Sequence, residues 1–438
     1  MKSLIKPRLG VCVTMSPLEV GANEAENILR EAISYLEKLN LELVVAKDVV
    51  CDDKTVAAAM SKFKEKEIDL LCLIEATWSE DYLVTDMLRQ IDVPVIIWAL
   101  PGIHTGSLCG SQQLCSVLKE LDMKYKFVYG DIGENKVHQK VLNYSQAVAL
   151  KRVLKTSRLG LIGYRVKGMT EVTFDELEMM SVFGPRTIHY GIGELKEKMA
   201  DVSLIDIEHK WNQVKAQVGR IEVDQDEVLH SIKVYLALKE FIKEDKLSGI
   251  AIECYPHLMG EVCLAASLLA EEGIVTACEG DMNSALAMFI LYQLTGQPIH
   301  NTDLLAVYEE DNSIVFSHCG SGGFSLSETK EQIVLSPVRL MNKGCCVLFP
   351  AKPGPVTLVN LVGRKGTYRM AIAPGEAIST GMIFPGNPIR VRFKTPIAQI
   401  LDTIATEGIG HHWMIGYGDV KDTLIDLCDL VSVRSITI

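Results

Sequence analysis

Residues 249–294 read GIAIECYPHLMGEVCLAASLLAEEGIVTACEGDMNSALAMFILYQL. Two short apolar runs, at 249–253 and 274–278, each precede a longer segment of helical character, at 258–272 and 283–294. Alternation of short apolar strands with helices is typical of βαβ units, in which helices cover both faces of a parallel sheet. The stretch therefore predicts an α/β domain.

The same alternation fills the first 155 residues and resumes near residue 159. Apolar runs in the first part predict buried strands, and the amphipathic segments between them predict helices. We expect strands at 9–15, 41–46, 70–74 and 93–100, and helices at 23–39, 54–66, 79–90 and, in the second part, 226–243. No G-x-G-x-x-G sequence follows the first strand, so a dinucleotide site has no support.

The pattern changes after the sequence LTGQPIHNTD, which marks a boundary near 295–303. Short β-like segments separated by turns rich in Pro and Gly follow at 304–318, 345–349, 356–362, 367–373 and 389–393, and then a helix near 419–430 and a last strand at 431–438. Such a series is typical of an antiparallel sheet or barrel. We therefore expect two Rossmann-like parallel-sheet domains, at 1–157 and 158–300, and a β-rich, antiparallel barrel-like C-terminal domain at 301–438.

Composition and charge exclude several classes of partner. The chain has 438 residues, with 44 Lys and Arg against 56 Asp and Glu, which gives a net charge of −12. Nucleic acids and anionic membranes attract basic surfaces, so the balance argues against both. No run reaches the roughly 18 apolar residues that a spanning helix needs. Twelve cysteines without C-x-x-C pairs, and an N-terminus without a cleavage signal, predict reduced thiols and a cytoplasmic location.

Acidic side chains follow two predicted strands of the second domain. Glu253 ends the strand at 249–253, and Asp281 follows the strand at 274–278 and opens a helix. Glu279 is a near neighbour of Asp281 that could be mistaken for the functional carboxylate. Ligands of open α/β sheets bind at the carboxyl ends of the strands, so both positions are candidates for function. A helix N-cap for Asp281 and a solvated strand end for Glu253 are the alternative interpretations.

A pair of histidines lies near the C-terminus. His411 and His412 are flanked by glycines in GIGHHWMIGYGD, and glycines let the backbone approach a ligand closely. Two carboxylates and one imidazole would form a mixed oxygen and nitrogen site. Such a site suits Mn²⁺ or Mg²⁺ with positions left open for substrate hydroxyls, whereas structural zinc prefers a closed tetrahedral set rich in sulfur or nitrogen.

The segments ACEGDMNSALAMFILYQLTGQP and GHHWMIGYGDVKDTLIDLCDL resemble the L-fucose isomerase / L-arabinose isomerase superfamily, and most closely its L-fucose isomerase-like branch. The resemblance implies a metal-dependent aldose–ketose isomerase. It implies Mn²⁺, with Mg²⁺ or Co²⁺ as substitutes, held by Glu253, Asp281 and His412, with His411 and His257 as competing positions. It also implies that Glu253 and Asp281 form the acid/base pair that moves protons through an enediol.

The resemblance further implies a homo-oligomer, a trimer or a hexamer, with the active site at a subunit interface. The side chains expected to contact the sugar are His318, Trp413 and His411 within one subunit and Trp78, His104 and Gln112 from a neighbour.

The substrate remains open at this point. Arg165, Lys167 and Arg186 are expected to follow strands of the second domain, with solvated loop charges as the alternative interpretation. If two of them converge on the site, the sugar carries an anionic group, as a 6-deoxy-6-sulfo (sulfoquinovose-type) aldose does, and Arg binds such oxygens in pairs. Otherwise we expect a neutral aldose such as L-fucose, D-arabinose or L-arabinose. A non-catalytic sugar-binding module and a metal-dependent aldolase or lyase are the alternatives.

Overall fold

The computed structural model describes residues 3–364 and 366–438. The chain forms two compact units. Of the described residues, unit 1 comprises residues 3–4, Val153–Lys421 and Val431–Ile438, and unit 2 comprises Ile5–Arg152 and Asp422–Leu430. Among the described residues, no helix combines the length and the apolar character that crossing a bilayer requires.

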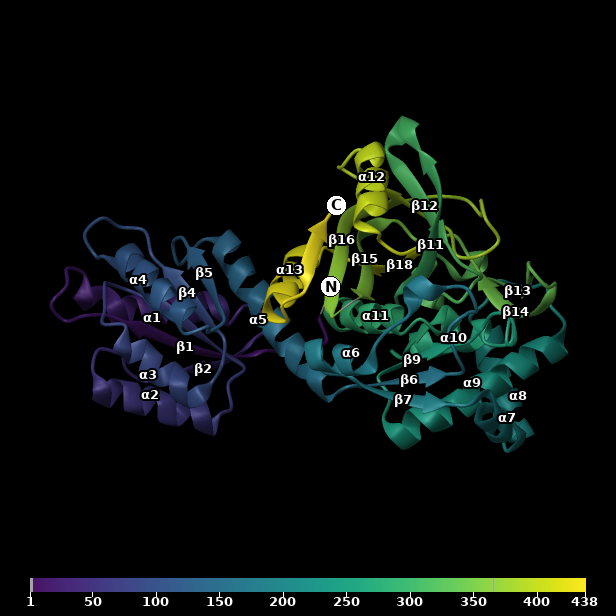
Figure 1. Ribbon diagram of the computed structural model, residues 1–438, viewed down its shortest axis with the longest axis horizontal. Coiled ribbons are helices and arrows are strands. Elements are labelled where there is room, and N and C mark those ends of the chain that lie inside the picture. Colours follow the sequence, from purple (N-terminus) through teal and green to yellow (C-terminus); the bar gives the residue numbers. More distant parts are fainter. Residues whose placement is uncertain (1–2, 365) are drawn as a thin grey trace. The chain divides into compact units, whose positions relative to one another are not determined.

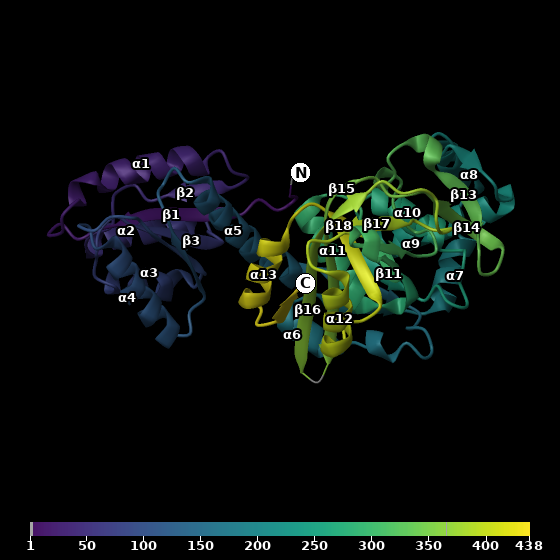
Figure 2. The ribbon, with the colours of Figure 1, turned by 90° about the horizontal axis from the view of Figure 1, so that it is seen from above.

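Unit 2 contains a five-stranded parallel sheet in the order β2-β1-β3-β4-β5. Its strands are β1 (Arg8–Thr14), β2 (Glu42–Val45), β3 (Leu70–Glu75), β4 (Val95–Ala99) and β5 (Tyr125–Tyr129). Its helices are α1 (Ala25–Leu36), α2 (Asp53–Glu65), α3 (Tyr82–Ile91), α4 (Ser107–Glu120), most of α5 (Asn135–Thr156) and most of α13 (Lys421–Leu430). Figure 2 shows α1 on one face of the sheet and α2, α3 and α4 on the other, as the alternating sequence pattern predicts.

Unit 1 begins with a second parallel sheet, in the order β10-β9-β6-β7. Its strands are β6 (Arg158–Ile162), β7 (Arg186–Tyr190), β9 (Gly249–Ile252) and β10 (Val275–Ala277). The accompanying helices are α6 (Glu176–Val182), α7 (Ile192–Ala200), α8 (Leu204–Lys215), α9 (Gln225–Asp245), α10 (Cys263–Glu271) and α11 (Met282–Thr295). Because the four strands are parallel, their carboxyl ends lie at one edge, which we call the carboxyl edge.

Helix α11 joins this sheet to the barrel that follows (Figure 1). It packs against β9 and β10 and also against the barrel strands β15 (Gly354–Arg364) and β18 (His412–Tyr417). Nearly all of its residues are buried, because its sequence is apolar on every side. A helix that is apolar on every side is stable only when other elements bury all of its faces. The packing brings the end of β10 close to the start of β18.

The rest of unit 1 is β-rich. The strands β15, β18, β11 (His300–Tyr308), β12 (Ser313–Ser317), β17 (Ile389–Arg392) and β16 (Thr367–Ile378) pair in that order, and β16 pairs with β15 again. These six antiparallel strands close on themselves, and β19 (Arg434–Thr437) adds to β16 in parallel. Helix α12 (Ile397–Glu407) and a small sheet of β8 (Arg220–Ile221), β13 (Val334–Val338) and β14 (Lys343–Leu348) complete the unit. The predicted fold class, two parallel sheets and then a barrel-like region, is confirmed.

Two details differ from the sequence-based expectation. The segment 304–318 is a hairpin of β11 and β12, because the acidic turn at 309–312 reverses the chain. Helix α13 belongs largely to unit 2, where Asp426 pairs with Lys126 at 2.5 Å. The division into three domains stays a prediction.

Candidate active site

The turn between β10 and α11 carries two acidic side chains with different surroundings. Asp281 is the N-cap of α11: its Oδ1 accepts from Ser284 N at 3.0 Å and its Oδ2 from Ser284 Oγ at 2.6 Å. Glu279 and Gly280 both adopt left-handed backbone angles, with φ of 63° and 70°. For a non-glycine residue such as Glu279 this conformation costs roughly 1–2 kcal/mol. Strain of this kind concentrates at functional sites.

His412 links the two acids from the other end of unit 1. It is the first residue of β18 and is 3% exposed. Its Nδ1 lies 2.8 Å from Asp281 Oδ2, and its Nε2 lies 2.8 Å from Glu279 Oε2. Both ring nitrogens therefore meet carboxylates. Since Asp281 also accepts two bonds from Ser284, its oxygens are occupied by protein donors.

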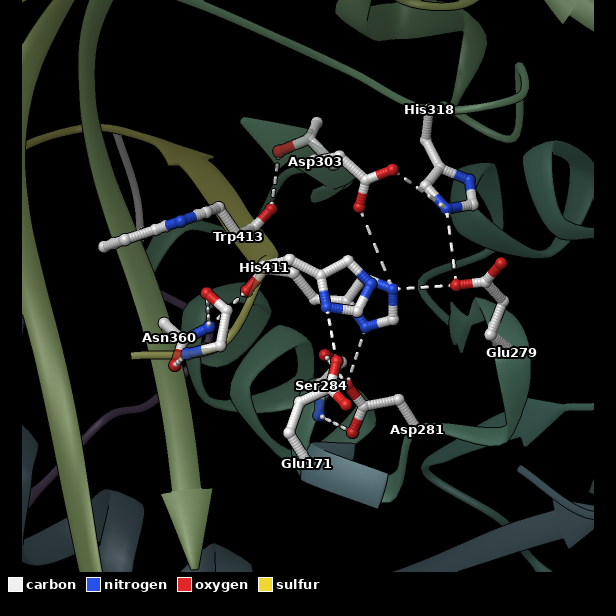
Figure 3. Close-up of polar contacts among 12 residues, drawn as sticks. Glu171, Glu279, Asp281, Ser284, Asp303, His318, Asn360, His411 and Trp413 are labelled. Atoms are coloured by element: carbon white, nitrogen blue, oxygen red, sulfur yellow. Dashed lines mark hydrogen bonds and ion pairs between the residues drawn. The ribbon is translucent and has the colours of Figure 1, made fainter. Parts of the chain in front are cut away.

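His318 and Asp303 complete the cluster (Figure 3). His318 Nε2 lies 3.9 Å from both Glu279 Oε2 and Asp303 Oδ2. Asp303 stands opposite His412 in the β11–β18 ladder, and its Oδ1 lies 3.9 Å from His412 Nε2. That buried oxygen has no hydrogen-bond partner. Buried polar atoms without partners are rare and call for an explanation, and a bound cation supplies one.

Two groups of three described residues have ligand atoms that all lie within 4.8 Å of one another. They are Glu279, His318 and His412, and Asp303, His411 and His412. Carboxylate oxygens with imidazole nitrogens suit Mn²⁺ and related divalent cations. Neither group contains Glu253 or Asp281, so the predicted set of Glu253, Asp281 and His412 is not one of them.

Burial and charge act in opposite directions on the cluster. Burial lowers the pKa of His412, but its bonds to Asp281 and Glu279 raise that pKa to about 10. Burial raises the pKa of Glu279, but His318 and His412 hold it well below its usual range. The cluster therefore holds an imidazolium beside carboxylates. A cation bound through His412 Nε2 has to displace a proton, so binding is linked to proton release.

Glu253 lies at the same edge of the sheet. It follows β9, the neighbour of β10, and is 8% exposed. Its Oε2 accepts from Tyr164 N at 2.8 Å, and its Oε1 lies 3.8 Å from His257 Nε2. The structure thus brings Glu253 to the carboxyl edge, as the sequence predicts, while its role as a ligand stays a prediction.

The residues beside His412 differ in accessibility. His411 Nδ1 pairs with Glu171 Oε1 at 2.6 Å, and the rings of His411 and His412 lie 4.0 Å apart. Trp413, by contrast, is 2% exposed and packs edge-on against Phe316 in the barrel core. Consecutive residues of a strand point to opposite faces, so His412 and Trp413 cannot both face the site. That Trp413 contacts the sugar stays a prediction.

The two candidate arginines lie at opposite edges of the sheet. Arg165 follows β6, at the carboxyl edge, and is half-buried. Arg186 was expected to follow a strand, and this is wrong: it begins β7, level with Arg158 at the start of β6. Parallel strands place their first residues at the edge away from Glu253. The two arginines therefore do not converge.

Three predicted sugar contacts belong to unit 2. Trp78 follows β3 and is half-buried, and its Nε1 donates to Gln113 Oε1 at 2.9 Å. His104 and Gln112 are exposed, in the loop before α4 and on α4. Their role as contacts from a neighbouring subunit stays a prediction.

Sequence reasoning missed Glu171 and Asp303, and it set Glu279 aside in favour of Asp281. Asp303 lies in the QPIHNTD segment, which reads as a domain boundary because of its Pro and polar residues, yet the segment enters β11. The run of polar residues from His300 to Asp303, all but the last buried, is the signal that marks it in retrospect. Glu171 has no such signal.

Comparison of the sequence with known proteins gives several relatives. No protein-family model matches the chain. A sulfoquinovose isomerase of Alkalicoccus urumqiensis is 27% identical over 387 residues, which cover 84% of this chain and 86% of that protein. A sulfoquinovose isomerase of Priestia aryabhattai is 24% identical, with 94% and 95% covered. An L-arabinose isomerase of Levilactobacillus brevis is 22% identical, with 96% of both chains covered.

The similarity to solved structures is too low to support an inference about fold or function. A periplasmic solute-binding protein of Actinobacillus succinogenes with bound D-allose is 12% identical, covering 67% of this chain and 92% of its own, with a TM-score of 0.18. A score that low carries neither fold nor function across. The sequence relatives span nearly the whole chain, and the acids and histidines of the resembling segments meet in one cluster. The chain belongs to the arabinose and fucose isomerase superfamily.

Proposed function

We propose that the protein is a divalent-cation-dependent isomerase that converts an anionic aldose of the 6-deoxy-6-sulfo type to its ketose. Its relatives make it an aldose–ketose isomerase that acts on sugars. The finer proposal depends on one observation above all: Glu279, His318 and His412 converge with ligand atoms within 4.8 Å of one another. A sugar-binding module has no need of such a cluster.

We infer that Glu279 Oε2, His318 Nε2 and His412 Nε2 hold the cation, with Asp303 as a further carboxylate beside them. Asp281 then acts on His412, because a carboxylate that accepts from the far ring nitrogen fixes the tautomer and orientation of a ligating imidazole. A bound Mn²⁺ would bind two neighbouring sugar oxygens and stabilise the negative charge that develops on them during the reaction.

Proton transfer falls to Glu253 in this proposal. Isomerisation removes a proton from the carbon next to the carbonyl and returns a proton to the neighbouring carbon. The base must be a carboxylate near the cation with a free oxygen, and the oxygens of Asp281 are occupied. Glu253 Oε2 accepts a hydrogen bond from Tyr164 N, which holds the side chain in place. Glu253 Oε1 lies 3.8 Å from His257 Nε2, too far for a hydrogen bond. We therefore assign the role of general base to Glu253, one member of the acid/base pair that the resemblance implies.

The relatives favour a sulfonated sugar over a neutral one, since the sulfoquinovose isomerases are 24–27% identical to this chain. A neutral aldose such as L-arabinose is the second candidate, because L-arabinose isomerases are 20–23% identical. The homo-oligomer, the cytoplasmic location and the preference for Mn²⁺ stay predictions.

The test is ketose formation by the purified protein, followed by NMR. We expect it to convert sulfoquinovose in the presence of Mn²⁺, to lose turnover after chelation and to regain it when Mn²⁺ is restored. Glu279→Gln should abolish turnover, and Glu222→Gln, an exposed acid, is the matched control. Binding without ketose would indicate the sugar-binding module, and carbon–carbon cleavage would indicate the aldolase or lyase. Either outcome contradicts the proposal.

A further inference from the structure

The loop at residues 163–173, which we call the strap, crosses the carboxyl edge of the sheet in unit 1. It begins where β6 ends and contains Arg165 and Lys167 between its ends. All of its residues are described, and its only regular secondary structure is a short 3-10 turn at Thr170–Val172.

Three contacts hold the strap against the site. Tyr164 N donates to Glu253 Oε2 at 2.8 Å, and Val166 N donates to the carbonyl oxygen of Glu279 at 3.2 Å. At the other end Glu171 pairs with His411 at 2.6 Å. The strap is thus bound to the ends of β9, β10 and β18, the three places that supply the candidate catalytic and metal-binding groups. Arg165 lies between the first two contacts.

The approach between the strap and the turn at Gly280 is close. A Cβ atom on Gly280 would lie 2.4 Å from Tyr164 O and 2.7 Å from Arg165 N. The backbone of Arg165 is therefore in van der Waals contact with the turn that carries Glu279. The Arg165 side chain therefore starts beside the turn that carries Glu279.

The guanidinium of Arg165 makes one hydrogen bond to the described part of the protein. Its Nη1 donates to the carbonyl oxygen of Val166 at 3.2 Å, and it is half-buried. None of the ion pairs among the described residues involves Arg165 or Lys167, although acidic residues surround the site. Those acids would repel a sulfonate or a phosphate, so an anionic sugar needs a cation at this edge.

We propose that Arg165 recognises the anionic group of the sugar, binding two oxygens of a sulfonate or a phosphate ester while the strap holds its backbone beside Glu253 and Glu279. The planar guanidinium matches such oxygens in pairs, which an ammonium does not. The inference rests on the proposed function and adds the residue that selects the charge of the substrate. Lys167, exposed on the same strap, adds positive charge at longer range.

The test compares three sugars that differ at carbon 6: sulfoquinovose, D-glucose 6-phosphate and the neutral 6-deoxy-D-glucose. Arg165→Gln should lower kcat/KM for the anionic sugar about 10- to 100-fold relative to the neutral one, mainly through KM, because a charge-assisted pair is lost. Arg165→Lys should restore part of that ratio. Arg186→Gln, which removes the same charge at the opposite edge of the sheet, is the matched control.

Each outcome decides the inference. A fall in the ratio for sulfoquinovose or for the phosphate ester supports it and identifies the anion. An unchanged ratio, or an equal fall for charged and neutral sugars, overturns it. If the wild type converts none of the sugars, the proposed function fails, and calorimetric binding then decides: sulfoquinovose must bind the wild type at least 10-fold more tightly than Arg165→Gln. Equal binding, or none to the wild type, overturns the inference.

Discussion

Asp281 and Glu279 show how two acids in one turn come to have different tasks. Asp281 accepts three hydrogen bonds, two from Ser284 and one from His412, and is 3% exposed. Glu279 faces the nitrogens of His412 and His318. The left-handed angles at Glu279 and Gly280 separate the two carboxylates. Asp281 therefore orients an imidazole, and Glu279 is free to bind a cation.

Asp281→Asn tests this division of roles. Asn is as good an N-cap as Asp, but it removes the negative charge that pairs with the buried ring of His412, so we expect the free energy of unfolding to fall by about 1–3 kcal/mol without the metal. The Mn²⁺ affinity should fall about 10- to 100-fold, because His412 loses the carboxylate that orients it. Calorimetric titration and urea unfolding measure the two quantities. Asp175→Asn, the N-cap of α6, is the control. An unchanged affinity for Mn²⁺ would mean that Asp281 acts only as a helix cap.

Proton release on metal binding follows from the raised pKa of His412. Its pKa of about 10 in the folded chain exceeds the ordinary 6.5, so its contribution to stability is complete below pH 6.5 and is lost as the pH rises through 10. At pH 7.5 Mn²⁺ should therefore release about one proton from this ring, and the affinity should increase with pH. Calorimetry in buffers of different ionisation enthalpy counts the protons. A count of zero would exclude His412 Nε2 as a ligand.

At the scale of elements, the turn before α11 and the strap depend on each other. Gly280→Ala places a methyl group against Tyr164 O and requires φ of 70° from alanine. We expect the free energy of unfolding to decrease by about 1–3 kcal/mol and turnover to fall. Gly193→Ala, in α7 with open space around it, should be neutral or slightly stabilising. Urea unfolding of both variants makes the comparison, and equal stabilities would mean that the turn tolerates a side chain.

The elements also show what the sequence reveals and what it does not. Strand and helix alternation predicts β9, β10 and α11 to within a few residues, because burial and periodicity are local properties. The same pattern places the two acidic residues at strand ends, whereas His412 as a ligand comes from the resemblance to a known family. Asp303 escapes notice, since its place depends on the antiparallel register of β11 with β18, more than a hundred residues away. The backbone angles that turn Glu279 rather than Asp281 toward the histidines are equally invisible.

At the scale of the whole molecule, all the proposed ligands and the strap lie in unit 1. Mn²⁺ at 100 times its Kd stabilises the form that binds it by about 2.7 kcal/mol. We therefore expect backbone amides to exchange with deuterium up to about 100-fold more slowly around 163–173, 278–284, 300–318 and 410–417. The sheet of unit 2, Arg8–Tyr129, should show no such change. Mass spectrometry maps the protection, and a uniform effect over both units would contradict a single site in unit 1.

The central claim is that acids and imidazoles from distant parts of unit 1 bind one divalent cation. An anomalous-scattering map from crystals grown with Mn²⁺ tests it most directly. We predict one strong peak within about 2.0–2.4 Å of Glu279 Oε2, His318 Nε2 and His412 Nε2. A map with no peak among these atoms, or with its peak at another set of side chains, would contradict the account.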